Sequence, residues 1–363
     1  MRNIGLDLVR IIAVVLVLGR HLHLPDDANL LLRLWYQGGW VGVDIFFVLS
    51  GFLVSSLMFR EHLKYGAVNV KRFLIRRAFK IYPAFWCFLA VTVSVQYALD
   101  TPPTRGHLLA ELLFLQNYRG GVWNHTWSLA VEEHFYLGIA ALFSFWKWLK
   151  PNHSYSGIPF VFFVIGFVCF SLRLVTLYFH PDFSYFAYLF GTHIRIDSLF
   201  FGVLLSYCCV YRQLERKLSF VPTWLFFFSG SLFLAPAFIF PLETNKWIST
   251  VGVILFYVGS GCIVIAALRF PESHFLPFKI LGALGAASYS IYLWHMPVNV
   301  WGWRLVKRLS GIDSFVLYCV VYIIGSCLFG LAMSRVVEFP ALRLRNYLYP
   351  SDNRSDSNNR EKT

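Results

Sequence analysis

Charged side chains stand inside the apolar stretch that opens this sequence, where an arginine and a histidine are spaced for joint chemistry. Arg10 and His21 are eleven residues apart, so on a helix they share one face and lie roughly 16 Å apart along its axis. Asp7 stands one turn before Arg10 and can pair with it. Histidine exchanges a proton near neutral pH, which makes it the commonest general base. The pattern therefore predicts acid–base chemistry inside an apolar segment.

Further ionisable residues fall near the ends of later apolar stretches. If the N-terminus lies in the cytoplasm, these ends share one depth, toward the external side of a membrane. The residues are Asp44, Glu132, Glu133, Arg195, Asp197 and His295. Charges inside a bilayer are costly and are functional candidates by default. Three interpretations stay open: a reaction centre in which Glu132 or Asp44 orients or charge-balances His21, a network that holds helices together, and a proton or ion pathway.

A basic segment between residues 60 and 80 is the second chemical feature. Arg72, Arg76 and Lys80 recur every four residues and so share a helical face, with Arg77 beside them. Such a segment can bind anionic lipid headgroups and mark the cytoplasmic side. It can also clamp the phosphates of an anionic cofactor that arrives from the cytosol. Both interpretations are kept.

The composition indicates which elements must position these residues. The chain has 363 residues, of which 57% are hydrophobic and 14% charged, whereas soluble proteins average about 25% charged residues. These values exclude a soluble globular enzyme and a disordered chain. The formal net charge of +13 then reports membrane orientation rather than nucleic-acid binding. The seven cysteines lie in apolar stretches without metal-ligand spacing, so no metal is expected.

The predicted fold is all-α: a polytopic membrane protein with about ten transmembrane helices in one bundle over residues 1–349. A polar tail at 350–363 is expected to be disordered and cytoplasmic. The stretch 108–116 is too short to span and is expected to be re-entrant or interfacial. The excess of Lys and Arg in alternate connections places both termini in the cytoplasm. The predicted spans are about 4–24, 40–59, 81–99, 126–148, 158–179, 193–211, 221–241, 248–268, 280–301 and 314–335.

Seven short motifs, in order along the chain, resemble the acyltransferase 3 family of membrane acyltransferases. The resemblance covers about residues 3 to 340. The motifs are the Arg10-x10-His21 arrangement, GVDIFFVLSGFLV (42–54), RRAFKIYP (76–83), TWSLAVEEHFYL (126–137), RIDSLFFG (195–202), ASYSIYLWH (287–295) and the late Glu338-Phe339-Pro340. Three positions depart from the family pattern: Lys80 stands for a more usual Arg, Arg20 precedes His21, and His134 stands for Gln.

The resemblance implies transfer of an acyl group, usually acetyl from acetyl-CoA, to a hydroxyl of a carbohydrate or glycolipid-type acceptor. It makes His21 the catalytic histidine and Arg10 its essential partner. It makes the basic residues at 72, 76, 77 and 80 candidates for the CoA phosphates, with Ser50 and Gly51 allowing close approach of the pantetheine arm. A bacterial inner membrane is the expected location, and direct transfer and an acyl-histidine intermediate both remain possible.

Ser128, Trp127 and Tyr289 are the candidate donors to a developing oxyanion. The rival function is a polytopic transporter or translocator in which the same charges form a proton or substrate pathway, although no internal repeat supports it. A membrane-embedded scaffold is a third alternative. The predicted spans occupy nearly the whole sequence, so we expect transfer to be completed within the bundle or passed to a separate partner.

Overall fold

The structure is a computed structural model that describes residues 3–149, 155–180, 182–271 and 275–350. These ranges contain helices, turns and coil and no strand, which confirms the predicted all-α class. Residues 351–363 of the predicted tail lie outside them. The helices are α1 (Ile4–Arg20), α2 (Leu30–Gly38), α3 (Gly42–Tyr65), α4 (Val70–Ala98), α5 (Arg105–Leu112), α6 (Gln116–Arg119), α7 (Trp127–Leu149), α8 (Ile158–Phe179), α9 (Ile196–Arg212), α10 (Leu214–Lys217), α11 (Thr223–Leu234), α12 (Pro236–Ile239), α13 (Val253–Leu268), α14 (Leu276–Ala286), α15 (Ser288–Pro297), α16 (Trp303–Ser310), α17 (Phe315–Cys319), α18 (Gly325–Met333) and α19 (Phe339–Leu348).

Short 3₁₀ or π segments join several of these helices. They are η1 (Gly39–Val41), η2 (Asn124–Thr126), η3 (Phe186–Phe190), η4 (Thr192–Ile194), η5 (Ile248–Gly252), η6 (Val298–Gly302), η7 (Val320–Ile324) and η8 (Ser334–Glu338). The predicted short segment at 108–116 falls on α5 and the turn after it. Its helical part ends at Leu112 and is too short to span, as expected.

The predicted count of ten spans is not confirmed. Within the described ranges, five helical segments are long and apolar enough to cross a membrane, and the bent pair α14 with α15–α16 would make six. Each predicted span overlaps a helix, but three of these are short: α1, α9 and the segment Thr223–Ile239 have 17 residues each, against roughly 20 for a full crossing. The five are Leu30–Tyr65, Val70–Ala98, Ile158–Phe179, Ile248–Leu268 and Phe315–Leu348.

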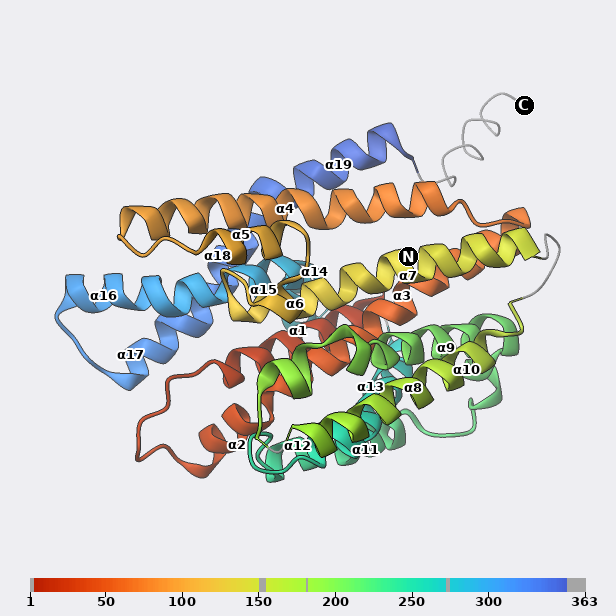
Figure 1. Ribbon diagram of the computed structural model, residues 1–363, viewed down its shortest axis with the longest axis horizontal. Coiled ribbons are helices and arrows are strands. Elements are labelled where there is room, and N and C mark those ends of the chain that lie inside the picture. The colour runs from red at the N-terminus through yellow and green to blue at the C-terminus, as the bar shows by residue number, and fades with distance from the viewer. Residues whose placement is uncertain (1–2, 150–154, 181, 272–274, 351–363) are drawn as a thin grey trace.

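The chain runs back and forth between two ends of the molecule (Figure 1). The loop after α1 and the turn between α16 and α17 lie at one end, and the connection from α3 to α4 lies at the other. Gly66 makes that connection sharp, because its φ of +71° is a left-handed conformation suited to glycine. Asn69 then caps α4 by accepting a hydrogen bond from the Arg72 N–H at 2.9 Å. The turn brings the basic part of α4 back alongside the bundle.

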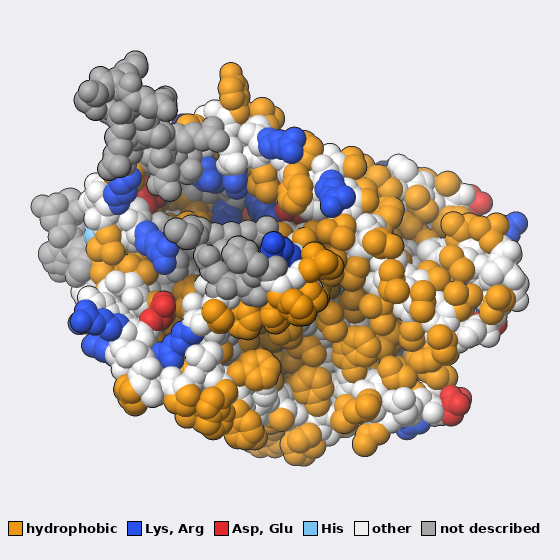
Figure 2. Space-filling view, turned by 180° about the vertical axis from the view of Figure 1, so that it is seen from behind, with side chains coloured by type: hydrophobic (Ala, Val, Ile, Leu, Met, Phe, Trp, Pro, Cys, Tyr) orange, Lys and Arg blue, Asp and Glu red, His pale blue; other side chains and the backbone are white. Residues whose placement is uncertain are grey.

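Apolar side chains cover the outside as well as the core. Phe47 and Phe135 are fully buried, whereas Phe160 and Phe167 on α8 are 73% and 72% exposed. Figure 2 shows apolar side chains over most of one face, with Lys and Arg gathered around a hollow at the end that holds the α3–α4 connection. Exposed apolar surface of this extent is suited to lipid and not to water.

Helices α3 and α9 approach each other through two glycines. A Cβ added to Gly51 would lie 1.9 Å from the Leu199 carbonyl oxygen, and one added to Gly202 would lie 2.2 Å from the Val48 carbonyl oxygen. Small residues at such crossings let helix backbones pack closely in membranes. Gly51 therefore serves the packing of α3 on α9.

We expect Gly51→Ala to lower the thermal unfolding midpoint of the detergent-solubilised protein. The added methyl group meets backbone, which cannot rotate away, so a loss at or above the upper end of the ~1–3 kcal/mol typical of overpacking is expected. Gly138→Ala on α7 is the matched control, because no described atom outside its own stretch of helix lies within 4 Å of its Cβ position. Equal midpoints for the two variants would contradict this account.

Candidate active site

A cavity of about 180 Å³ opens between α1, α3, α4, α7 and the bend from α14 to α15. The bend of 69° between α14 and α15 brings Ser288, Tyr289 and Tyr292 to its wall. Gly285, at the end of α14, lies so close to α1 that a Cβ there would be 1.9 Å from the Asp7 carbonyl oxygen. Close packing of α14 on α1 therefore sets this side of the cavity.

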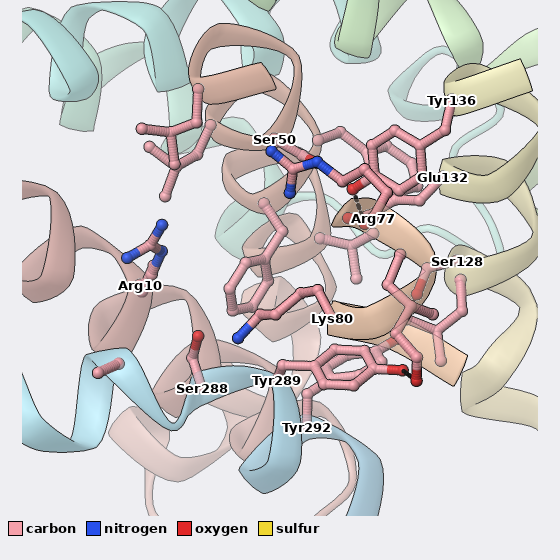
Figure 3. A pocket seen from close by; sticks show the side chains of 18 residues that line it. Arg10, Ser50, Arg77, Lys80, Ser128, Glu132, Tyr136, Ser288, Tyr289 and Tyr292 are labelled. Atoms are coloured by element: carbon pink, nitrogen blue, oxygen red, sulfur yellow. Dashed lines mark hydrogen bonds between the residues drawn. The ribbon is translucent and has the colours of Figure 1, made fainter. Parts of the chain in front are cut away.

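Three cationic side chains point into the cavity from α1 and α4 (Figure 3). They belong to Arg10, Arg77 and Lys80. Arg10 pairs with Asp7 at 2.5 Å, and Lys80 pairs with the buried Glu338. The guanidinium of Arg77 lies 5.5 Å from the centre of the Tyr136 ring. Three cations facing one space make a site for an anionic group.

A polar chain lines the wall opposite Arg10. Tyr136 donates to the Glu132 carboxylate at 2.8 Å, so the Ser50 hydroxyl, 2.7 Å from the Tyr136 oxygen, is the donor in that contact. Ser128, Glu132 and Tyr136 are spaced by four residues and therefore share one face of α7. The sequence-predicted residues Ser50 and Glu132 thus meet Arg10, Arg77 and Lys80 in one cavity.

One stripe of α15 leads from this cavity to a group of histidines. Tyr289, Tyr292 and His295 are spaced by three residues and lie along one helix face. The Tyr292 hydroxyl donates to the His125 carbonyl at 2.7 Å, and Ser128 donates to Tyr292 at 2.6 Å. Since Ser128 and Tyr292 line the cavity, its wall is hydrogen-bonded directly to the turn that carries His125.

His21, His295 and His125 form a compact cluster. The His21 and His295 ring centres are 5.0 Å apart, and those of His295 and His125 are 4.8 Å apart. His21 ends α1, and its carbonyl accepts from Asn299 at 2.7 Å. The cluster brings together residues from α1, η2 and α15.

The turn that carries His125 is fixed by α5 and α6. Thr126 donates to the buried Glu111 carboxylate at 2.7 Å, and the Trp123 N–H donates to it at 3.3 Å. Gln116 donates to the Thr126 carbonyl at 3.1 Å. Burial raises the pKa of Glu111 to about 7, against these hydrogen bonds, which favour the carboxylate. The short predicted segment thus positions a histidine of the cluster.

The chain matches the family model of an acyltransferase domain over residues 3–331, which is nearly its whole length. It belongs to the acyltransferase 3 family. The peptidoglycan O-acetyltransferase OatA of Listeria monocytogenes is 28% identical over 319 residues, which are 81% of this chain and 49% of that protein. The O-acetyltransferase OatA of Staphylococcus aureus is 28% identical over 322 residues, 82% of this chain and 50% of that protein. The chain thus spans about half the length of these relatives. No solved structure matches it.

In this member of the family, four sequence-predicted residues have partners away from the cavity. Gly51 packs on α9, and Asp44 pairs with Arg195 at 2.7 Å. Arg72 lies 3.4 Å from Glu61, and Arg76 donates to the Tyr349 carbonyl at 2.7 Å. Of the predicted basic clamp, Arg77 and Lys80 are the residues that line the cavity.

Two residues that depart from the family pattern have defined partners in this protein. Arg20 pairs with Glu243 and donates to the Tyr185 hydroxyl at 2.8 Å. Burial opposes ionisation of Glu243, but hydrogen bonds from Tyr185 and Arg20 outweigh it and lower the pKa of that carboxyl. His134 contacts the Thr192 hydroxyl at 2.7 Å.

We expect Asp44→Asn to destabilise the protein. Asp44 and Arg195 are both 0% exposed, and removing one partner leaves the other charge buried, at a cost of about 3–5 kcal/mol. The measurement is the thermal midpoint in detergent. The control is Asp313→Asn, whose exposed pair with Lys307 is worth about 0–1 kcal/mol. A stable Asp44→Asn protein with reduced kcat would instead favour the interpretation of Asp44 as a helper of His21.

Proposed function

We propose that this chain is a membrane-embedded O-acyltransferase that moves an acetyl group from cytosolic acetyl-CoA to a hydroxyl of a carbohydrate acceptor. The proposal rests on the contacts that connect the cavity to the histidine cluster. The cavity holds three cations, and its wall is hydrogen-bonded to the turn of His125, which belongs to the cluster that contains His21. The family match supports acyl transfer, and the names of the relatives support an O-acetyl product.

The donor enters from the basic end of the molecule. Arg77 and Lys80 bind the CoA phosphates, and Arg10 lines the route toward His21. A cavity of about 180 Å³ is suited to the thin acyl-pantetheine arm, with the nucleotide held outside it. In this proposal the basic end faces the cytosol, with both termini on the cytosolic side of a bacterial inner membrane.

His21 acts as the general base through one defined atom. Its Nδ1 lies 3.0 Å from the Val17 carbonyl. A carbonyl only accepts, so Nδ1 carries the hydrogen and Nε2 carries the lone pair. Nε2 takes the proton of the acceptor hydroxyl as the oxygen attacks the thioester carbon. An acyl–His21 intermediate would form at the same atom.

The other cavity residues stabilise the charge that develops on the thioester oxygen. Ser128 and Tyr289 line the cavity and are candidate donors. Trp127 stacks on Phe190 with ring centres 4.9 Å apart and serves packing. CoA departs as a thiolate, which then takes up a proton to give the free thiol.

The acceptor is a glycan of the cell surface. The Listeria monocytogenes relative is named for peptidoglycan, so soluble peptidoglycan fragments are the first acceptor to test. Purified protein is incubated with acetyl-CoA and these fragments, and the release of free CoA thiol is measured. Mass spectrometry then determines whether the fragments have gained the mass of an acetyl group. Thiol release with an acetylated glycan supports the proposal. Proton-coupled flux through vesicles without thiol release would favour a transporter.

A further inference from the structure

Each histidine of the cluster holds one ring nitrogen against a backbone carbonyl. Nδ1 of His295 lies 2.5 Å from the Tyr292 carbonyl, and Nε2 of His125 lies 3.1 Å from the Leu293 carbonyl. By the reasoning applied to His21, these nitrogens carry the hydrogens. The second nitrogen of each neutral ring is therefore a lone-pair acceptor, so the cluster has three acceptors and donates no ring hydrogen inward.

Two of these acceptor nitrogens are buried without a partner. His295 is 0% exposed and His125 is 3% exposed. Nε2 of His295 and Nδ1 of His125 accept no hydrogen bond from any described residue. Leaving a buried polar atom unpaired is costly, so a functional reason for it is expected. Each of these two nitrogens has a lone pair that an additional proton could occupy.

We propose that His295 and His125 are proton-holding partners of His21, so that the three imidazoles share the proton that leaves the acceptor hydroxyl. This inference rests on the proposed function. In the resting cluster the three lone-pair nitrogens cannot hydrogen-bond to one another, because none of them carries a hydrogen. Once His21 is protonated at Nε2, its new N–H can be accepted by His295, whose ring is the nearer neighbour. His125 contacts His295 and extends the shared site.

The proton that leaves the acceptor is used again in the same reaction. The acceptor O–H bond breaks, its oxygen bonds to the acyl carbon, and the carbon–sulfur bond breaks with its electron pair moving to sulfur. The proton passes to His21, is shared with His295 and His125, and returns to the thiolate to give free CoA thiol. Tyr292 and Ser128 join the cavity wall to the His125 turn, so the place where the proton is held adjoins the place where the thiolate forms.

Two variants separate this role from a structural one. His295→Asn retains an amide nitrogen that can donate to the Tyr292 carbonyl but removes the lone-pair nitrogen. His125→Gln does the same at the Leu293 carbonyl. We expect each to lower kcat roughly 10- to 150-fold, the range of one charge-assisted hydrogen bond, with the KM for acetyl-CoA unchanged. His193→Asn is the control, because His193 contacts Tyr118 outside the cluster and should leave kcat unchanged. Wild-type kcat in both cluster variants would overturn the proposal.

A second measurement does not depend on activity. Nitrogen-15 spectra of histidine-labelled protein in detergent should show Nε2 of His295 and Nδ1 of His125 without hydrogen at neutral pH, assigned by the loss of each signal in the matching variant. Hydrogen on either of these nitrogens would overturn the inference even if the enzyme is active. Wild-type protein that releases no thiol would instead overturn the proposed function, and these spectra would still decide the state of the cluster.

Discussion

Protein carrying His21→Asn is expected to bind acetyl-CoA normally and to transfer acetyl about 10²–10⁴-fold more slowly, the usual contribution of a general base. The amide nitrogen of asparagine can still donate to the Val17 carbonyl, as Nδ1 of His21 does. It offers no lone pair in place of Nε2. The variant therefore removes the base while leaving the end of α1 in place. The measurement is kcat and KM from thiol release.

The control for this variant must exclude failed insertion or folding. Membrane fractionation, a single symmetric peak in size-exclusion chromatography and a normal Kd for CoA establish that His21→Asn protein is folded. The Kd should not change, because the cations that line the cavity are remote from His21. Arg77 and Lys80 are on α4, and Arg10 is about 16 Å from His21 along α1. Normal acetylation of the glycan by this variant would refute the assignment of His21. A loss of CoA binding in parallel with kcat would indicate that His21 has a structural role.

The relation between Arg10 and His21 could be predicted because it depends on helix geometry alone. A fixed rise and rotation per residue place the two on one face of α1, and Arg10 does line the cavity while His21 joins the histidine cluster. The cation site could also be predicted in outline. Which basic residues line the cavity could not be predicted. Arg76 and Arg77 are adjacent in sequence, and the direction in which each side chain points depends on the packing of α4 against α7 and α19.

His125 shows why part of the site is invisible in the sequence. It stands in a 3₁₀ turn before α7 among aromatic residues typical of a membrane interface. Its place beside His295 depends on Glu111 and Gln116, which hold that turn from α5 and α6. Such contacts join residues on different helices, and no local periodicity reports them. The Asp44–Arg195 pair is a similar case, because the sequence predicts a common depth for the two residues but does not identify them as partners.

The predicted number of spans is not confirmed, for a related reason. Apolar composition identifies helices that lie in or near a bilayer, but it does not show whether a helix of 17 residues crosses it completely. Such a helix can lie within a bundle, where neighbouring helices cover its polar ends. α1 is well buried and carries Asp7 and Arg10 as a pair, so protein surrounds the Asp7 carboxylate and Arg10 faces the cavity.

Arg77→Gln is expected to weaken CoA binding roughly 10- to 150-fold, since one hydrogen bond between charged groups is lost. Arg77 lines the cavity, and its contact at Tyr136 is a ring face, so its charge is available to a phosphate. Lys80 is a poorer test, because its removal would leave Glu338 buried without that partner. The effect should fall on Kd and KM, with kcat at saturating acetyl-CoA changing little.

Arg76→Gln is the matched control, because it removes the same charge from the adjacent position. Arg76 donates to the Tyr349 carbonyl, and any general contribution of the basic segment to headgroup binding or orientation is lost equally from both variants. Titration of detergent-solubilised protein with CoA at two salt concentrations gives the decisive comparison. Arg77→Gln should bind more weakly and with less salt dependence than Arg76→Gln, because one fewer phosphate contact is screened. Equal weakening in the two variants would show that the segment attracts CoA only through its overall charge, and unchanged binding in both would remove the cavity from the donor site.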